Sequence, residues 1–297
     1  MKDQRRLLSS MHTHTVFCDG KDDIETMCRA AHEKNLLAIG FSGHSPVYEK
    51  TGIVTDSNIS EDRIDEYIAQ VRGAKERWAG KLDVFLGLEV DYIKGLRSAL
   101  DSDIKAMNLD YTIGSVHFIV PNNGAQPFAV DGPYDEFEKG LSEGFNSDTR
   151  ALMHSYYDAL HEMIELGGFD ILGHADIIKK NFKDKTCWPQ EEEFIRQKEI
   201  AKAAARTGIV FEINTGGINR KKINDVYPSL SFLRLFREND VPVIITADAH
   251  SADQIDGNYD LAFQTLISAN FSEYVLLKQN NIEKVFWQKV KISENIV

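Results

Sequence analysis

Histidines and carboxylates occur two residues apart at two places in this chain. His12 and His14 form one pair, and Asp248 and His250 form the other. Side chains two positions apart in an extended strand point to the same face, so each pair presents its groups together. Imidazole and carboxylate groups without cysteine favour zinc, iron or manganese over a structural thiolate site. The two pairs therefore indicate a divalent-metal site.

Four further groups of the same kind lie in or just after apolar runs, namely His44, Glu89, His117 and His174. One histidine in a strand is more often a hydrogen-bonded core residue than a ligand. Five of the seven expected strands end in such a group, however, and buried ionisable groups are costly unless they are paired or metal-bound. The set as a whole favours a metal centre over packing. His32 and His161 are expected on helix surfaces, and the role of His154 stays open.

Short β-branched runs alternate with helical patterns along the chain. The expected strands are Ser9–Val16, Leu37–Gly43, Asp83–Asp91, Tyr111–Phe118, Asp170–His174, Ile209–Asn214 and Val243–Ala247. The expected helices are Ile24–Lys34, Glu61–Trp78, Asp101–Met107, Arg150–Leu166, Glu191–Arg206, Ser229–Glu238 and Asp260–Asn270. Seven βα units in series predict an α/β fold with a parallel sheet closed into a (β/α)7 TIM-like barrel. The candidate ligands would then meet at its C-terminal mouth.

Two segments depart from this alternation of strands and helices. Residues Pro121–Phe145 carry turn residues and aromatics, and predict a loop insertion near 119–146 that could act as a lid. A C-terminal extension near 271–297 contains two apolar segments, Glu273–Lys278 and Lys284–Ile292, which predict a hairpin. No repeat or linker is visible, so we expect a single domain over 1–297.

Composition restricts the partners. The chain has 34 Lys and Arg against 46 Asp and Glu, a net charge of −12, which argues against binding long nucleic acids. A small phosphorylated substrate needs only a few local cations and stays possible. The cysteines Cys18, Cys28 and Cys187 form no CxxC motif, as is typical of a reducing compartment. We expect a cytoplasmic protein without a signal peptide or membrane span; the oligomeric state is not indicated.

The strings around the candidate ligands follow one another in a distinctive order. They are Met11-His12-Thr13-His14-Thr15, Phe17-Cys18-Asp19-Gly20, Gly40-Phe41-Ser42-Gly43-His44-Ser45-Pro46, Gly87-Leu88-Glu89-Val90-Asp91, Gly114-Ser115-Val116-His117, Leu172-Gly173-His174 and Thr246-Ala247-Asp248-Ala249-His250-Ser251. Over about residues 10–270 they resemble the motifs of the polymerase and histidinol phosphatase (PHP) superfamily, in particular its histidinol-phosphate phosphatase branch. The resemblance implies a distorted seven-stranded (β/α) barrel with two or three divalent metals at its mouth.

The resemblance also implies a division of the ligands among three metal positions. The first would take His12, His14, Glu89 and Asp248. The second would share Glu89 and add His117 and His174. The third would use His44, His250 and Asp19, a carboxylate where some family members have histidine.

The same resemblance implies the hydrolysis of a phosphomonoester. Clustered divalent cations neutralise the phosphate and lower the pKa of a bound water, so we expect attack by a metal-bridging hydroxide without a phosphoenzyme. Asp19 or His250 could relay a proton to the leaving alkoxide. Arg220 is a candidate phosphate clamp, the alternative being a solvated loop residue. His117, Asp91 and Asp131 are further candidates for contact with substrate, and the two aspartates could instead lie behind the site or on the surface.

The expected reaction is the conversion of L-histidinol phosphate to L-histidinol and phosphate, a step of histidine biosynthesis. Two alternatives remain open. The same centre could serve a phosphoesterase or exonuclease acting on nucleotides or oligonucleotides. The barrel could also be a non-catalytic metal-binding module.

Overall fold

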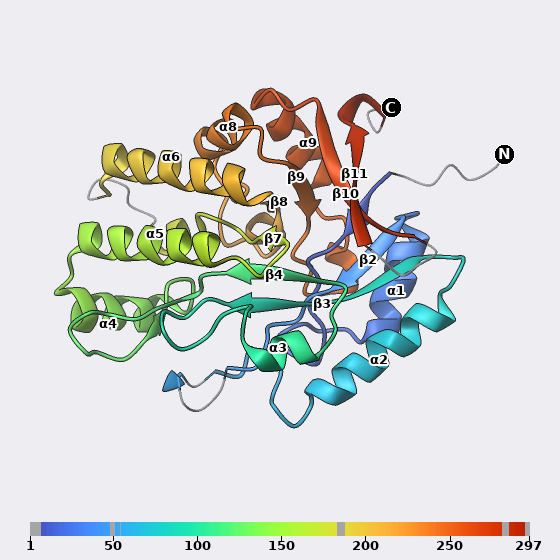
Figure 1. Ribbon diagram of the computed structural model, residues 1–297, viewed down its shortest axis with the longest axis horizontal. Coiled ribbons are helices and arrows are strands. Elements are labelled where there is room, and N and C mark those ends of the chain that lie inside the picture. The colour runs from blue at the N-terminus through green and yellow to red at the C-terminus, as the bar shows by residue number, and fades with distance from the viewer. Residues whose placement is uncertain (1–6, 48–50, 54, 183–187, 281–284, 295–297) are drawn as a thin grey trace.

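Seven parallel strands form the central sheet of the computed structural model, which describes residues 7–47, 51–53, 55–182, 188–280 and 285–294 (Figure 1). The strands are β1 (Ser9–Ser10), β2 (Ala38–Phe41), β3 (Asp83–Asp91), β4 (Tyr111–Ser115), β7 (Ile171–Leu172), β8 (Val210–Asn214) and β9 (Val243–Thr246). Their order is β1-β2-β3-β4-β7-β8-β9, and every neighbouring pair is parallel. The seven strands are those that the apolar runs predict, although several are shorter than expected, above all β1 and β7.

The two outer strands of this order meet just beyond their C-terminal ends. The backbone NH of His14 donates to the carbonyl of Ala249 at 2.8 Å, and that of Ala249 donates to the carbonyl of His12 at 3.0 Å. Thr13 and Ala249 form a parallel bridge between these hydrogen bonds. The sheet is thereby joined into a distorted barrel, which confirms the predicted fold. The same bridge brings His12 and His14 next to the end of β9.

Helices cover the outside of the barrel (Figure 1). They are α1 (Ile24–Glu33), α2 (Ile64–Arg77), α3 (Ser102–Ala106), α5 (Thr149–Leu166), α6 (Gln190–Thr207), α8 (Leu230–Glu238) and α9 (Tyr259–Ser268). The short helix α7 (Gly216–Asn219) follows β8 at the mouth instead. Local sequence sets their ends: Asp23 caps α1 by accepting from the NH of Thr26, and Asp148 caps α5. Gly208 ends α6 in the left-handed conformation. No described helix is long and apolar enough to cross a membrane.

The insertion after β4 is more ordered than the predicted loop. Strands β5 (Phe118–Ile119) and β6 (Phe128–Ala129) pair antiparallel, and helix α4 (Tyr134–Phe145) follows them. Phe137 of α4 is buried, with its ring 6.3 Å from that of Phe128 and 5.2 Å from that of Phe182. The expectation of a loop was therefore wrong here, because aromatic side chains at helical spacing anchor α4 to the barrel.

The C-terminal segment forms the predicted hairpin, β10 (Glu273–Gln279) with β11 (Val285–Lys291). Val275 and Leu277 pack into a cluster inside the barrel, together with Met11, Ala38, Phe85, Tyr111, Ile113, Ile171, Val210 and Ile244. In Figure 1 the hairpin lies on the side from which β3 and β4 begin. The hairpin thus plugs the end of the barrel opposite to the mouth. Cys18 and Cys28 are free thiols, and Cys187 lies outside the described residues.

Candidate metal centre

All nine residues predicted as metal ligands meet at the mouth of the barrel. They form four overlapping groups whose donor atoms lie within 4.8 Å of one another. The groups are His14, Asp19, His44 and His250; His12, His14 and Glu89; His12, His174 and Asp248; and His44, Glu89 and His117. They come from segments at or beyond the ends of β1, β2, β3, β4, β7 and β9, as a parallel barrel requires.

Glu89 lies at the centre of this arrangement and is 1% exposed. Its Oε2 is 3.1 Å from His12 Nε2 and 3.1 Å from His44 Nδ1, while its Oε1 is 2.9 Å from His174 Nε2 and 3.5 Å from His117 Nε2. Burial would raise the pKa of Glu89, but the charges of His12, His44 and His117 hold it well below its usual value. The carboxylate is therefore ionised, with one oxygen toward each of two sets of imidazoles, as a bridging ligand must be.

The spacing around His14 fits a divalent metal. Its buried Nε2 forms no hydrogen bond with any described residue, and lies 3.6 Å from Glu89 Oε2 and 3.4 Å from Asp248 Oδ1. Zinc–ligand bonds of about 2.1 Å in a tetrahedral site separate neighbouring donors by about 3.4 Å. An orphaned nitrogen between two carboxylates at this distance is the arrangement expected of a ligand rather than of a packed core histidine.

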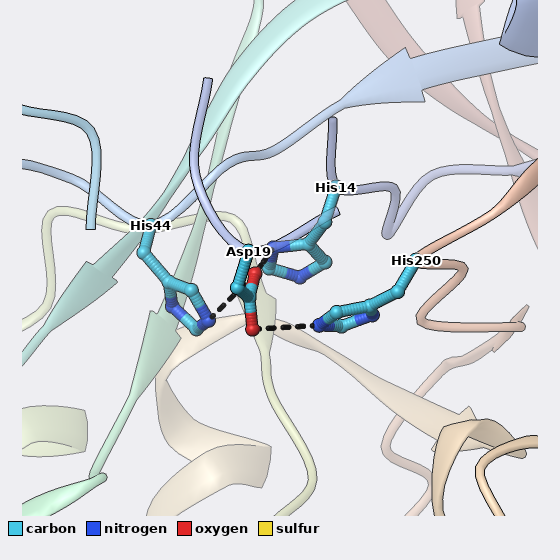
Figure 2. A group of neighbouring side chains, drawn as sticks. All are labelled: His14, Asp19, His44 and His250. Carbon is cyan, nitrogen blue, oxygen red and sulfur yellow. Dashed lines mark hydrogen bonds and ion pairs between the residues drawn. The ribbon is translucent and has the colours of Figure 1, made fainter. Parts of the chain in front are cut away.

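Asp19 joins three imidazoles at the more open edge of the centre (Figure 2). Its Oδ1 is 3.4 Å from His14 Nδ1 and 3.9 Å from His44 Nε2, and its Oδ2 is 3.0 Å from His250 Nε2. Burial would raise the pKa of Asp19, but hydrogen bonds from His14 and His250 lower it far below its usual value. Its side chain is 33% exposed, so this group of ligands is the one that a substrate can approach from outside.

A tight turn carries Asp19 to this position. The backbone NH of Gly20 donates to the carbonyl of Thr15 at 3.1 Å, and that of Lys21 donates to the carbonyl of His250 at 2.7 Å. A Cβ at Gly20 would lie 2.4 Å from the nitrogen of Thr15, so the turn closes only around glycine.

Two buried carboxylates orient ligand histidines from behind. Glu212 Oε2 lies 2.9 Å from His12 Nδ1, and its Oε1 accepts from the backbone NH of His174 at 2.7 Å. Asp91 Oδ1 lies 2.7 Å from His117 Nδ1. Such carboxylate–imidazole pairs fix the tautomer and the direction of a metal-binding ring. Asp91 is thus placed behind His117, which favours an orienting role over contact with substrate.

Sequence reasoning did not select Glu212 as a site residue. The signal was its charge in the otherwise apolar segment Ile209–Asn214, because a carboxylate buried in a strand needs a partner.

Arg220 lies at the mouth, just after α7. Its two terminal nitrogens contact the carboxylate of Asp248 at 3.1 and 3.0 Å, and Nη1 is 2.6 Å from His250 Nδ1. A Cβ at Gly216 would lie 2.6 Å from that of Asp248, so glycine lets α7 approach β9 closely. Arg220 is therefore part of the site rather than a solvated loop residue. His154 instead pairs with Glu192 at 2.8 Å on the outer helices.

Comparison with known proteins identifies the family. A model of the PHP domain matches residues 10–216, which is more than two thirds of the chain. The chain belongs to the PHP family. The matched range ends before Asp248 and His250, which the barrel places against the ligands of the matched part.

Similar proteins match this PHP chain over most of their own length. The histidinol-phosphatase of Bacillus subtilis strain 168 is 26% identical over 264 residues, covering 84% of this chain and 96% of that protein. A crystal structure from Listeria monocytogenes is similar with a TM-score of 0.75 and 22% identity, over 85% of this chain and 99% of the other. The histidinol phosphate phosphatase of Lactococcus lactis, crystallised with zinc, L-histidinol and phosphate, is similar with a TM-score of 0.63 and 19% identity, over 95% of this chain and 99% of the other. The last two likenesses support the fold.

Proposed function

We propose that this PHP protein is a metal-dependent phosphomonoesterase that hydrolyses L-histidinol phosphate to L-histidinol and phosphate, as a step of histidine biosynthesis. The observation that carries the proposal is the convergence of nine imidazole and carboxylate residues around Glu89. The Bacillus subtilis relative, named as a histidinol-phosphatase and matched over nearly its whole length, supports the substrate. So does the Lactococcus lactis complex with L-histidinol and phosphate.

Two or three divalent ions, of zinc, iron or manganese, are the proposed cofactors. His12, His14, Glu89 and Asp248 would hold one ion, and His117 and His174 a second that shares Glu89. His44, His250 and Asp19 would hold a third. Divalent ions bound there would neutralise the charge of the phosphate and lower the pKa of a water molecule.

The chain's own polar groups have separate tasks in this proposal. Arg220 presents a guanidinium beside Asp248 and His250, and its planar donors suit two oxygens of one phosphate. When the phosphate ester bond breaks, the departing alkoxide oxygen must gain a proton. The attacking water loses a proton in the same reaction. Asp19 Oδ2 and His250 Nε2 lie 3.0 Å apart at the open edge, and we propose that one of these two groups accepts the proton from the water and relays it to the alkoxide.

The proposal includes a cytoplasmic enzyme of one domain that acts on a small phosphorylated substrate. It requires neither a membrane nor nucleic acid. The net charge of −12 supports this choice of substrate, because long polyanions would be repelled.

The decisive experiment measures phosphate release from L-histidinol phosphate beside a panel of nucleotides and short oligonucleotides, with metal content determined on the same preparation. We expect kcat/KM for L-histidinol phosphate to exceed the others by about 100-fold or more, because polar contacts select strongly among substrates. Two or more metals per chain should be found, and a chelator should remove both metal and activity until zinc or manganese is restored.

Other outcomes would point elsewhere. Turnover of nucleotides alone would discard the substrate while keeping the metal centre. A metal-loaded protein that turns over no ester would instead support a non-catalytic barrel.

A further inference from the structure

A short backbone strap, Val130–Gly132, lies beside the metal centre, between His117 after β4 and Asn181 after β7. The NH of Val130 donates to the carbonyl of His117 at 2.8 Å. From the other side, Asn181 Nδ2 donates to the carbonyls of Val130 at 2.9 Å and of Gly132 at 3.2 Å. Both ends of the strap are therefore fixed, and the residue between them, Asp131, is held in one place.

Asp131 presents a carboxylate that the metal centre does not use. It belongs to none of the candidate ligand groups among the described residues. Lys180 donates to its backbone carbonyl, and the Lys180 Nζ lies 3.6 Å from Oδ2, which is longer than a hydrogen bond. The side chain is 23% exposed. The Asp131 carboxylate is thus anchored through its backbone and remains accessible at the rim.

Charges across the mouth act on this carboxylate. Burial would raise the pKa of Asp131, but His117, Lys180 and His174 lower it, so the group is an anion at neutral pH. Burial would likewise lower the pKa of Arg220, whereas Asp248, Asp19 and Asp131 raise it. The mouth therefore carries a cation on the side of β9 and an anion on the side of β4 and β7.

This polarity matches the substrate proposed above. L-Histidinol phosphate has a phosphate at one end and, a few bonds away, an amino group that is protonated at neutral pH. Its imidazole has an ordinary pKa near 6.5 and is mostly neutral. With the phosphate held between the nine ligand residues and Arg220, the ammonium group would extend beyond these ligands. There it would meet a carboxylate that is not itself a ligand, such as that of Asp131.

We propose that Asp131 binds the ammonium group of the substrate and makes this phosphatase selective for cationic phosphomonoesters. The inference rests on the proposed function. It assigns a specificity role to the strap that none of the nine ligand residues can fill, since each of them is turned toward the metal centre. Lys180 and Asn181 act as positioning residues for the strap.

The test compares Asp131→Asn with the unmodified enzyme on three esters. They are L-histidinol phosphate, 3-(imidazol-4-yl)propyl phosphate, which differs from it only in lacking the amine, and p-nitrophenyl phosphate. We expect kcat/KM for L-histidinol phosphate to fall about 10- to 100-fold, mainly through KM, because a hydrogen bond between charged groups is lost. The other two esters should change less than about twofold, and metal content should be unchanged. Asp135→Asn, the same substitution at an exposed position four residues along, should leave all three rates as they are.

The outcomes separate the two proposals. An equal fall on all three esters would mean that Asp131 supports the metal centre, and would overturn the inference. An undiminished kcat/KM for L-histidinol phosphate would also overturn it. The same holds if kcat/KM falls equally for L-histidinol phosphate and the imidazole ester that lacks the amine, but not for p-nitrophenyl phosphate. An unmodified enzyme without preference for L-histidinol phosphate over p-nitrophenyl phosphate would overturn the proposed function, a result visible before any substitution is made.

Discussion

Strand β3 begins in the apolar cluster that Val275 and Leu277 of the hairpin complete, here called the plug, and ends among the charged ligands of the mouth. Phe85, near its beginning, packs with Val275 and Leu277 of the C-terminal hairpin. Glu89, four residues later on the same face of the strand, lies among the imidazoles of the mouth. β8 repeats the pattern, with Val210 in the plug. The same inward face of the barrel thus has one end built for stability and the other for chemistry.

The two ends differ in what they contribute to folding. Burying a side chain such as Leu277 removes apolar surface from water and stabilises the protein by about 1.5–3 kcal/mol. Burying carboxylates and imidazoles costs free energy unless they are paired or bind metal. The difference teaches that substitutions at the plug should act on stability, and those at the mouth on metal and catalysis.

The largest expected effect is that of Glu89→Gln at the mouth. A neutral amide cannot serve as an anionic bridge between two cations, so kcat/KM should fall by about 10³-fold or more, with loss of bound metal. Steady-state phosphate release and metal analysis on the same sample measure it. Glu66→Gln, at an exposed position of α2, is the matched control and should change neither. Full metal and activity in Glu89→Gln would remove Glu89 from the centre.

A substitution in the plug should lower stability and leave catalysis unchanged. Leu277→Ala is expected to lower the free energy of unfolding by about 2–5 kcal/mol, because Leu277 is 2% exposed and its truncation leaves a cavity. Urea unfolding of the metal-loaded protein measures this, and kcat at low temperature should be unchanged. Phe286→Ala, on the partner strand but 47% exposed, should cost much less. Equal losses from the two variants would mean that the hairpin does not plug the barrel.

The sequence predicts the mouth better than its surroundings. Period-two spacing in His12 and His14, together with strand ends that meet in a parallel barrel, predicts that residues up to 238 positions apart converge. Helix α4 escaped prediction because the glycines and turn residues around it masked the spacing of Phe137 and its neighbours. Partners such as Asp91 for His117 depend on which side of a ring each carboxylate occupies, which strand spacing does not specify.

Glu212 lies between the two ends and should give the smallest effect. Glu212→Gln keeps the shape of the side chain but removes the charge that orients His12 through Nδ1, so metal affinity or kcat should fall about 10- to 100-fold. Metal titration followed by kinetics at saturating metal separates the two quantities, with Glu66→Gln again as the control. A loss as large as that of Glu89→Gln would make Glu212 a ligand in its own right. The backbone NH of His174 and Thr246 Oγ1 also donate to Glu212. If Glu212→Gln caused no loss, these two hydrogen bonds would explain why the carboxylate is buried. The part of the barrel that serves catalysis would then begin one layer of side chains nearer the mouth.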